Sequence, residues 1–282
     1  MNSRICSVAT LLVIVTLAIS SPVRAQGYLG GNLRPFAVLA GTTVTCAGAS
    51  VITGDVGVSP GAAIVGFGGA PCTDIGTLHG GDATAANAQA NLTTAYNTLA
   101  GLPCAATVGP NLTGLTLTQG VYCVGAAASN LTGVLTLDAQ GNPNAVFVFQ
   151  MSSTLITSPN STVNMINGGN ACSVEWQVSS SATLDTNTTF LGNILALTAV
   201  TMNNGASLVG RALARNAAVT LINNNISFAA CGVGGGAGGV PPPFPPAGVP
   251  TLPQFAGLLL AALLLSGGVY MVNRRSRLAS RR

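Results

Sequence analysis

The side chains that could act as acids, bases or nucleophiles are few and spread along the chain. Among 282 residues there are six acidic residues, no lysine and one histidine, His79. Enzymes that cut acidic polysaccharides need clustered carboxylates together with basic residues that hold the substrate. The six carboxylates are scattered instead: Asp55, Asp74, Asp82, Asp138, Glu175 and Asp185. The sequence therefore predicts a protein that is not an enzyme.

Motifs for phosphate and calcium binding are absent as well. The chain has no Gly-x-x-x-x-Gly-Lys loop and no repeated Gly-Gly-x-Gly-x-Asp frame. His79 stands just ahead of an expected helix, so we interpret it as a helix-entry residue rather than a catalytic one. We expect no metal and no cofactor.

Cysteines are the remaining reactive groups. Cys6 lies in an N-terminal targeting segment, and six cysteines follow it. An even number in an exported chain favours disulfide bonds, although six cysteines allow fifteen pairings. Zinc binding is the alternative, but the chain has no Cys-x-x-Cys pair and only one histidine. From their positions we predict bridges between Cys46 and Cys72, Cys104 and Cys123, and Cys172 and Cys231.

Threonine, which is abundant here, offers a different kind of chemistry on a flat sheet. Its side chain is stiff at χ1 and presents a methyl group and a hydroxyl together. On a sheet such groups repeat about every 4.8 Å between strands and about every 6.7 Å along a strand. Such a face can hold a layer of ordered water, because the hydroxyls anchor water and the methyl groups limit competing hydrogen bonds. The alternative is that threonine occurs here only because it suits strands and corners.

Both ends of the chain have features of targeting segments. Arg4 precedes an apolar stretch, residues 8–19, and residues 23–25 have the small-x-small form of a signal peptidase site. We interpret residues 1–25 as a secretory signal peptide. An N-terminal membrane anchor fits poorly because the apolar stretch is short.

The composition changes abruptly towards the C-terminus. Residues 232–248 are rich in glycine and proline, which indicates a linker after a domain of residues 26–231. In the last segment, 249–282, an apolar stretch just long enough to span a bilayer is followed by five arginines, which the positive-inside rule would keep in the cytoplasm. The basic residues therefore belong to targeting, and we expect no nucleic-acid partner.

The elements that must position any site are predicted by repeats. Gly192 and Gly210 are eighteen residues apart, and one added residue then aligns Thr201 with Thr220. A weaker third copy occupies residues 49–64. A period near eighteen with short β-rich runs predicts an all-β fold, a β-solenoid whose coils bury their inner faces on one another.

One segment departs from this pattern. Asp82 is a good N-cap, apolar residues follow it at helical spacing, and Gly101 and Pro103 are stop signals. We predict one long α-helix over about residues 82–100, packed against the solenoid. Its buried face is expected to contain Ala85, Ala88, Leu92, Ala95, Tyr96 and Leu99.

Seven blocks of the central region carry a family resemblance. They are FAVLAGTTVT (36–45), VITGDVGVSPG (51–61), LHGGDA (78–83), LTLTQGVYC (115–123), LTLDAQGNPNAVFVFQM (135–151), WQVSSSATL (176–184) and GRALARNAAVTL (210–221). In this order they resemble the microbial ice-binding protein family, over roughly residues 29–228. The resemblance implies a right-handed, three-sided solenoid with a companion helix, in which the N-terminal coil stacks beside C-terminal coils. It also implies ice binding through one flat face, without catalysis or cofactor.

The same resemblance suggests the residues of that face. Some family members carry Thr-Ala/Gly-x-Thr/Asn there, and residues 198–201 and 113–116 match this pattern. The next coil departs from it, reading Ala-Ala-Val-Thr up to Thr220. The implied ice-binding residues are Thr113, Thr116, Thr198, Thr201 and Thr220.

The tail resembles a C-terminal sorting signal of Gram-negative bacteria. Residues 249–252, Val-Pro-Thr-Leu, stand where that signal has Ile-Pro-Thr-Leu. The resemblance implies processing by a sorting protease in the membrane, and a permanent membrane anchor is the alternative. We therefore expect a chain that is exported and either kept at the cell envelope or secreted.

Two functions fit these observations. The first is an antifreeze protein that binds ice and inhibits its growth or recrystallisation, or ties the cell to ice. The second is a structural or adhesion module of the cell surface that uses the same solenoid to bind polysaccharide or a partner. Thermal hysteresis and recrystallisation assays separate them.

The three predicted disulfides give a direct test. Each should stabilise the fold by roughly 3 to 4 kcal/mol, because each closes a loop in the unfolded chain. Peptide mapping under non-reducing conditions should recover three linked peptide pairs, and six free thiols would contradict the prediction.

Overall fold

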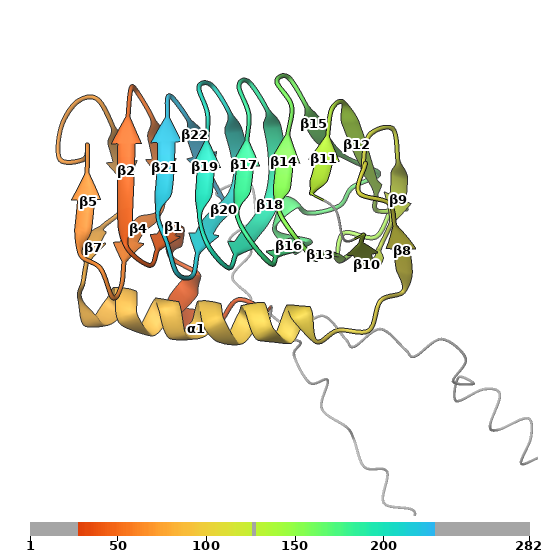
Figure 1. Cartoon of the computed structure of the whole chain (residues 1–282), viewed down its shortest axis with the longest axis horizontal. Coiled ribbons are helices and arrows are strands. Elements are labelled where there is room, and N and C mark those ends of the chain that lie inside the picture. Colours follow the sequence, from red (N-terminus) through yellow and green to blue (C-terminus); the bar gives the residue numbers. More distant parts are fainter. Residues whose placement is uncertain (1–27, 126–127, 229–282) are drawn as a thin grey trace, which may run out of the picture.

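The computed structural model of the chain describes residues 28–125 and 128–228. These residues form stacked coils of short strands with one long helix alongside (Figure 1). The predicted signal peptide, the linker and the C-terminal segment lie outside the described residues. Among the helices that are described, none is long and apolar enough to cross a membrane.

The named strands pair in parallel and build three ladders. The first ladder is a separate seven-stranded sheet. In spatial order it contains β11 (Ser129–Leu131), β14 (Leu155–Thr157), β17 (Ala182–Leu184), β19 (Val200–Met202), β21 (Val219–Ile222), β2 (Thr43–Ala47) and β5 (Ala63–Val65).

The other two ladders share the long strands β18 (Thr189–Ala196) and β20 (Ser207–Ala214). The helix-side ladder uses their second halves. It also contains β7 (Leu78–Gly80), β4 (Asp55–Val58), β1 (Phe36–Ala40), β16 (Val174–Val178), β13 (Phe147–Met151), β10 (Gly120–Val124) and β8 (Ala106–Val108). The outer ladder uses their first halves, with β6 (Thr73–Ile75), β3 (Val51–Thr53), β22 (Asn225–Ser227), β15 (Thr162–Ile166), β12 (Val134–Asp138) and β9 (Thr116–Thr118).

The repeats seen in the sequence are successive coils, as predicted. Gly192 pairs with Gly210 and Thr201 with Thr220, so the added residue falls where it was expected. Gly210 has a φ of +150° at the bend of β20, and a Cβ atom there would collide with the carbonyl of Gly192. The bend therefore requires glycine at this position.

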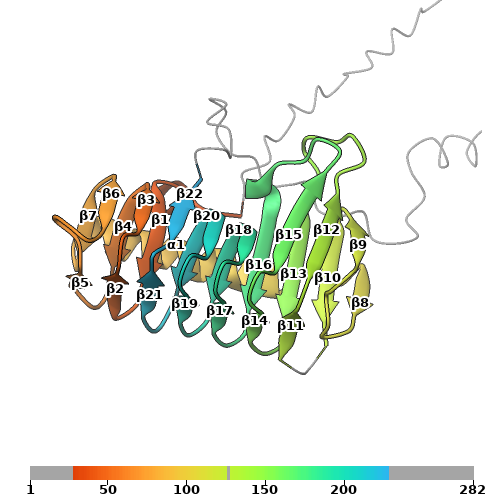
Figure 2. The ribbon, with the colours of Figure 1, turned by 90° about the horizontal axis from the view of Figure 1, so that it is seen from above.

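The coils do not stack in sequence order, which confirms a second expectation. The N-terminal strands β1, β2 and β3 pair with the C-terminal strands β20, β21 and β22. Figure 2 shows these two groups side by side, while the middle of the chain forms the opposite end of the stack. Distant segments therefore share one core.

Aromatic rings fill part of the interior because in-register strands place like residues above one another. Tyr122 and Phe149 have ring centroids 5.5 Å apart, and Phe149 and Trp176 have centroids 4.1 Å apart, both stacked. Phe190 continues the series at 4.9 Å from Trp176. Stacked rings of this kind add to the free energy gained from burying apolar area.

The predicted helix is present as α1 (Ala83–Ala100), and its buried face has the six predicted members. Asp82 caps it, since its Oδ1 accepts a hydrogen bond from the Ala85 amide at 2.8 Å. The helix covers the helix-side ladder by packing on leucines such as Leu39, Leu195 and Leu213. The middle of that side of the stack is therefore covered, while β7 and β8 at its two ends keep exposed residues.

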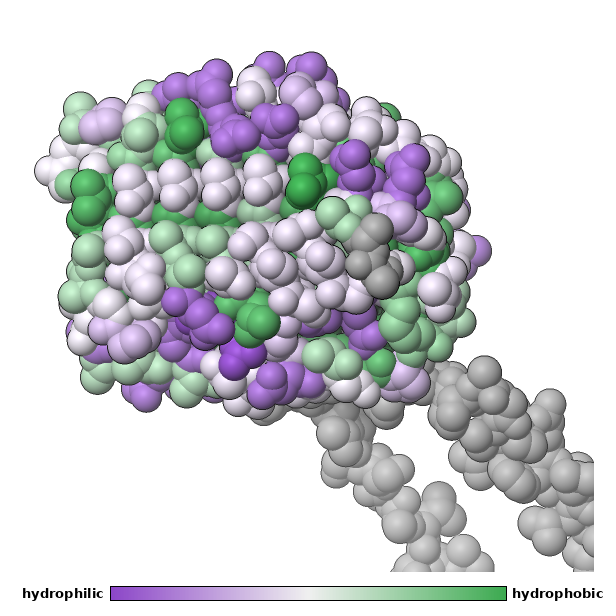
Figure 3. All heavy atoms as spheres, viewed as in Figure 1, coloured by the Kyte–Doolittle hydropathy of each residue, from purple (hydrophilic) through white to green (hydrophobic). Residues whose placement is uncertain are grey.

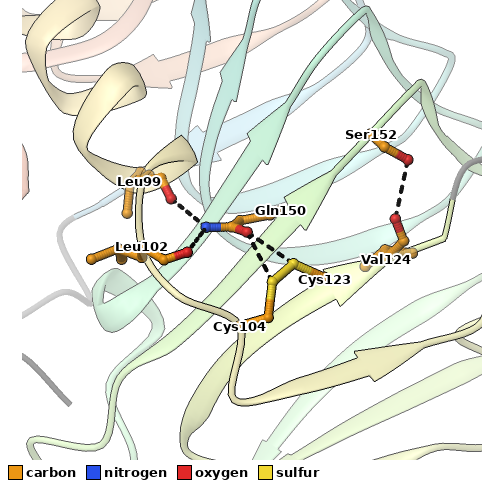
Figure 4. The surroundings of a disulfide bond; sticks show 7 residues. All are labelled: Leu99, Leu102, Cys104, Cys123, Val124, Gln150 and Ser152. Atoms are coloured by element: carbon orange, nitrogen blue, oxygen red, sulfur yellow. Dashed lines mark hydrogen bonds between the residues drawn. A yellow bond between two sulfur atoms is a disulfide. The ribbon is translucent and has the colours of Figure 1, made fainter. Parts of the chain in front are cut away.

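Two of the predicted disulfides, Cys46–Cys72 and Cys104–Cys123, are present. For the third, Cys231 lies outside the described residues, so this bridge stays a prediction. Figure 4 shows that Gln150 lies beside the second bridge. Its amide Nε2 donates to the carbonyls of Leu99 and Leu102 at 2.6 and 2.8 Å, which fastens the end of α1 to β13.

Two short helical turns, η1 (Gly31–Leu33) and η2 (Ala171–Ser173), are bonded to a buried polar row on the helix-side ladder, through the carbonyls of Arg34 and Cys172. In this row Glu175, Asn193 and Arg211 occupy paired positions on β16, β18 and β20. Asn193 donates to Glu175 Oε1 at 3.1 Å and accepts from Arg211 Nη1 at 3.0 Å. Burial raises the pKa of Glu175 to about 8, although Asn193 and Arg211 oppose the shift. Burial lowers the pKa of Arg211 to about 10.

The raised pKa of Glu175 predicts that stability falls with rising pH. In the unfolded chain this carboxyl loses its proton near its ordinary value of 4.5, whereas the folded chain keeps it up to about 8. The stabilising contribution is complete below pH 4.5 and is lost as the pH rises towards 8. Because one unit of pKa difference corresponds to about 1.4 kcal/mol, the loss should reach a few kcal/mol in order of magnitude.

The variant Glu175→Gln should lose this dependence, because an amide does not titrate in this range, while its oxygen can still accept from Asn193 and keep the row intact. The facing groups Arg211, Arg34 and Tyr28 are left in place. Urea unfolding at pH 5 and pH 8 measures both free energies of unfolding. If the free energy of unfolding changed equally between the two pH values in the variant and in the parent, Glu175 would not be the source of the pH dependence.

Candidate functional site

The seven-stranded sheet has an alternating pattern that leaves small residues on its outer surface. In β19, Val200 and Met202 are buried and Thr201 between them is half-buried. In β17, Ala182 and Leu184 are buried around the half-buried Thr183. Successive side chains of a strand point to opposite faces, so the apolar residues fill the core and the threonines face outward.

Four outward threonines lie in register on four consecutive strands. Thr45 of β2 pairs with Thr220 of β21, Thr220 with Thr201 of β19, and Thr201 with Thr183 of β17. We call these four residues the threonine ladder. Figure 3 shows a straight row of equal side chains across this face, with an apolar residue at each end. Neighbouring strands lie about 4.8 Å apart, so the ladder spans about 14 Å.

A second outward row runs beside the threonine ladder. It lies two residues earlier along the chain, within β2 and just before the first residues of β21, β19 and β17, about 6.7 Å away. Its members are all small, which keeps the surface even: Thr43, Ala218, Ala199 and Ser181. The two rows together form a flat patch without a charged side chain.

The hydroxyls of the threonine ladder are free to bind water. Within residues 28–125 and 128–228, none of the four makes a side-chain hydrogen bond to the protein. Other threonines do: Thr113 and Thr132 share a hydrogen bond of 3.0 Å, and Thr157 and Thr188 share one of 2.8 Å. A hydroxyl without a protein partner keeps its donor and both acceptor sites for solvent.

Asp185 marks the border of the patch, directly after β17. Its Oδ1 accepts from Asn203 Nδ2 at 2.9 Å and from the Thr186 amide at 2.7 Å. The hydrogen bond from Asn203, followed by that from Thr186, lowers the pKa of this carboxyl. The charge is therefore fixed at the edge and does not reach the threonine ladder.

The structure divides the five threonines implied by the family resemblance between separate places. Thr201 and Thr220 are neighbours in the ladder, and Thr198 is exposed on the turn before β19. Thr113 lies at a corner, where it is bonded to Thr132. Thr116 lies on β9 of the outer ladder, paired with Thr136.

Two ladder residues, Thr45 and Thr183, were not among those five. A signal for them exists in the sequence, since each stands between two apolar residues that point inward. The same apolar-Thr-apolar triplet surrounds Thr201 and Thr220. The triplet is not specific to the threonine ladder, because Thr116 on the outer ladder also stands between two leucines. Neither the triplet nor the four-residue family pattern reports which sheet a threonine joins.

The remaining surfaces are less regular. Helix α1 covers the helix-side ladder. The outer ladder presents a row in which the residue type changes from strand to strand: Thr73, Val51, Asn225, Ser207, Thr189, Thr162 and Val134. Such a row lacks the constant spacing of identical groups that the threonine ladder has.

In the described part of the chain, the groups with catalytic potential are Ser59 and His79, and His79 Nε2 lies 3.8 Å from Asp55 Oδ2. His79 Nδ1 lies 2.7 Å from Asp82 Oδ2 at the start of α1, which fits its interpretation as a helix-entry residue. Residues 57–61 have the form Gly-x-Ser-x-Gly, but Ser59 is buried, and its hydroxyl has no hydrogen bond to His79 in the described part of the chain. An esterase nucleophile is instead exposed on a turn between a strand and a helix. Among the described residues no three His, Cys, Asp or Glu side chains could hold a metal ion.

Known proteins are similar to this chain in both sequence and fold. A family model described as ice-binding-like matches residues 38–227. The ice-binding protein of Nostoc sp. (strain HG1) is 50% identical over 201 residues, which cover 71% of this chain and 73% of that protein. Ice-binding protein 1 of Shewanella frigidimarina (strain NCIMB 400) is 31% identical over 229 residues, which cover 71% of this chain and 26% of that longer protein. The crystal structure of an ice-binding protein from an Antarctic biological consortium has a TM-score of 0.69 and 44% identity, over 73% of this chain and 93% of that one.

Because the hydroxyls of the threonine ladder have no protein partner in the part of the chain that the structure describes, substituting a ladder threonine should hardly change the free energy of unfolding. Thr201→Val should change the free energy of unfolding by less than about 0.5 kcal/mol, because no protein hydrogen bond is lost. Thr157→Val should cost about 1 to 3 kcal/mol, since it leaves the Asp185 amide without a partner and leaves the Thr188 hydroxyl with only its longer hydrogen bond, of 3.4 Å to the Ser158 carbonyl. Urea unfolding of the two variants decides, and equal losses would show that Thr201 is bonded within the protein.

Proposed function

The chain belongs to the ice-binding-like family, and on this basis we propose that it is an ice-binding protein that adsorbs to ice through the threonine ladder. The observation that carries the proposal is the register of Thr45, Thr220, Thr201 and Thr183. Four identical side chains with free hydroxyls stand in one straight row on a flat, uncharged surface.

The ladder would act by ordering water. Each hydroxyl can hold a water molecule, and the regular spacing holds neighbouring molecules at fixed separations of about 4.8 Å. The methyl groups exclude other arrangements, and the stiff χ1 of threonine keeps the groups in place. Each contact is weak, so the grip depends on their number and on flatness. Ice that adsorbs the protein can then grow only between bound molecules.

We propose that the three strand ladders are the sides of a right-handed solenoid and that the protein has no catalytic step. The bends at Gly192 and Gly210 support the first point, because they divide β18 and β20 between two sides. The burial of Ser59 supports the second. Binding to ice needs only the geometry of the surface.

We further propose that the chain is exported by a Gram-negative bacterium and kept at its envelope or secreted. The support is the signal-peptide pattern of residues 1–25 and the tail of residues 249–282, which would be held in a membrane or processed by a sorting protease. The two disulfides also fit an oxidising compartment.

Bulky substitutions test the site. Thr201→Tyr and Thr183→Tyr should abolish thermal hysteresis and inhibition of recrystallisation, because a protruding ring holds the neighbouring side chains away from ice. The matched variant Thr116→Tyr, on the outer ladder, should keep both activities. Circular dichroism should stay unchanged in all three.

The outcomes separate the two functions that fit the sequence. Full activity of both ladder variants would place the ice site on another surface. Absence of activity in the parent protein would favour the adhesion module that binds polysaccharide or a protein partner.

Extending the threonine ladder by one residue should strengthen ice binding. Ile156 pairs with Thr183 and is 39% exposed at the end of the row. Ile156→Thr would add a fifth threonine in register and should raise thermal hysteresis. Val134→Thr, at an exposed position of the outer ladder, is the control and should have no effect. Equal effects of the two substitutions would show that threonine content, not register, sets the activity.

A further inference from the structure

The C-terminal strand of the described fold lies inside the stack rather than at its end. Strand β22 pairs with β20 on one side and with β3 on the other. In a solenoid built in sequence order, the last strand is at an edge and has a single neighbour. Here the N-terminal coils stack beyond it. Removing β22 therefore requires breaking its backbone hydrogen bonds to β20 and to β3 at the same time.

The residue that follows β22 is fastened as well. Phe228 lies beside Gly54, where a Cβ atom would collide with the phenyl ring. The guanidinium carbon of Arg211 lies 4.3 Å from the centre of that ring. A cation over an aromatic face is attractive, and more so where water is excluded. Glycine on one side and arginine on the other therefore form a seat for Phe228.

Arg211 also holds the other end of the fold. Its Nη2 donates to the carbonyl of Arg34 at 2.9 Å, just before β1. Its Nη1 donates to Asn193 at 3.0 Å, which ties it to the middle of the stack. One buried side chain thus joins the N-terminal segment, the end of the C-terminal strand and the core.

This fastening is far from the threonine ladder. Figure 2 shows β22 on the side of the stack away from the seven-stranded sheet. A force applied through the end of β22 would therefore enter opposite to the surface proposed to face ice. A tether at that end leaves the ladder uncovered.

We propose that the domain is a load-bearing anchor, which holds ice on one side and is pulled on the other through its own continuation, residues 229–282. This inference rests on the proposed ice binding. It adds that the domain bears force while it is bound to ice and held through residues 229–282. The interior position of β22 resists peeling, and Arg211 fixes Phe228 where the load enters. The predicted bridge from Cys231 to Cys172 would add a covalent link at the same place, since Cys172 Sγ lies 3.7 Å from Arg211 Nη1.

Single-molecule pulling tests the anchor. The full chain, with Cys231→Ser so that the third bridge bears no load, is attached to a cantilever through a tag after Arg282 and brought onto ice. On retraction it should detach from ice without extending beyond the length of residues 229–282, at most about 3.6 Å per residue. Release of further length from the fold before detachment would overturn the proposal.

Two variants locate the anchor. Arg211→Met combined with Glu175→Gln removes the guanidinium and keeps position 175 neutral at every pH, with an oxygen that can accept from Asn193; it should release further length before detachment. Arg215→Met is the matched control, because its guanidinium lies over Tyr96 of α1 and not over the chain end. It should behave like the parent. Detachment of the double variant without further extension would overturn the role of Arg211.

The same chains are also assayed in solution for their uptake into growing ice. Uptake together with early unfolding on the cantilever would overturn the anchor alone. No uptake by the parent would overturn the proposed function and this inference with it. Unchanged uptake by the double variant is expected, since the threonine ladder is left intact.

Discussion

The parallel, in-register pairing of successive coils is the constraint on which the rest of this structure depends. Because each coil lies about 4.8 Å from the next, each position stands directly above its partner in the neighbouring coil, and like residues placed at such positions form rows. Inside, the repetition gives the stacked rings of Phe149 and Trp176. Outside, it gives the row of Thr45, Thr220, Thr201 and Thr183. The same strand register therefore aligns the residues of the core and those of the threonine ladder.

The same stacking of coils also places requirements on the residues at corners and at buried polar positions. Corners need backbone conformations with positive φ, and glycine or asparagine stands there, as at Asn187, Gly205 and Asn223. A polar residue in one coil meets a polar residue in the next, which yields the buried row of Glu175, Asn193 and Arg211. That row is kept neutral at Glu175 by burial and is also where both ends of the fold are joined.

Much of the fold could be predicted from sequence, because its signals are local. The helix follows from its cap and spacing, and the coils of Thr201 and Thr220 follow from neighbouring repeats. The site was harder to predict, since Thr45 joins the threonine ladder from the N-terminal part of the chain. No local repeat indicates that it pairs with Thr220. Thr116 was selected by a short pattern that does not report which sheet a residue joins. The seat of Phe228 depends on contacts among three distant segments and has no sequence signature of its own.

The central claim is that ice touches the threonine ladder, and magnetisation transfer from ice measures that contact directly. In solid-state NMR of the protein frozen at an ice surface, polarisation from ice protons should reach the methyl groups of Thr45, Thr183, Thr201 and Thr220 first. The outer-ladder threonines, such as Thr116 and Thr189, should receive it later. Earlier transfer to the outer ladder, or equal transfer to all exposed threonines, would contradict the account.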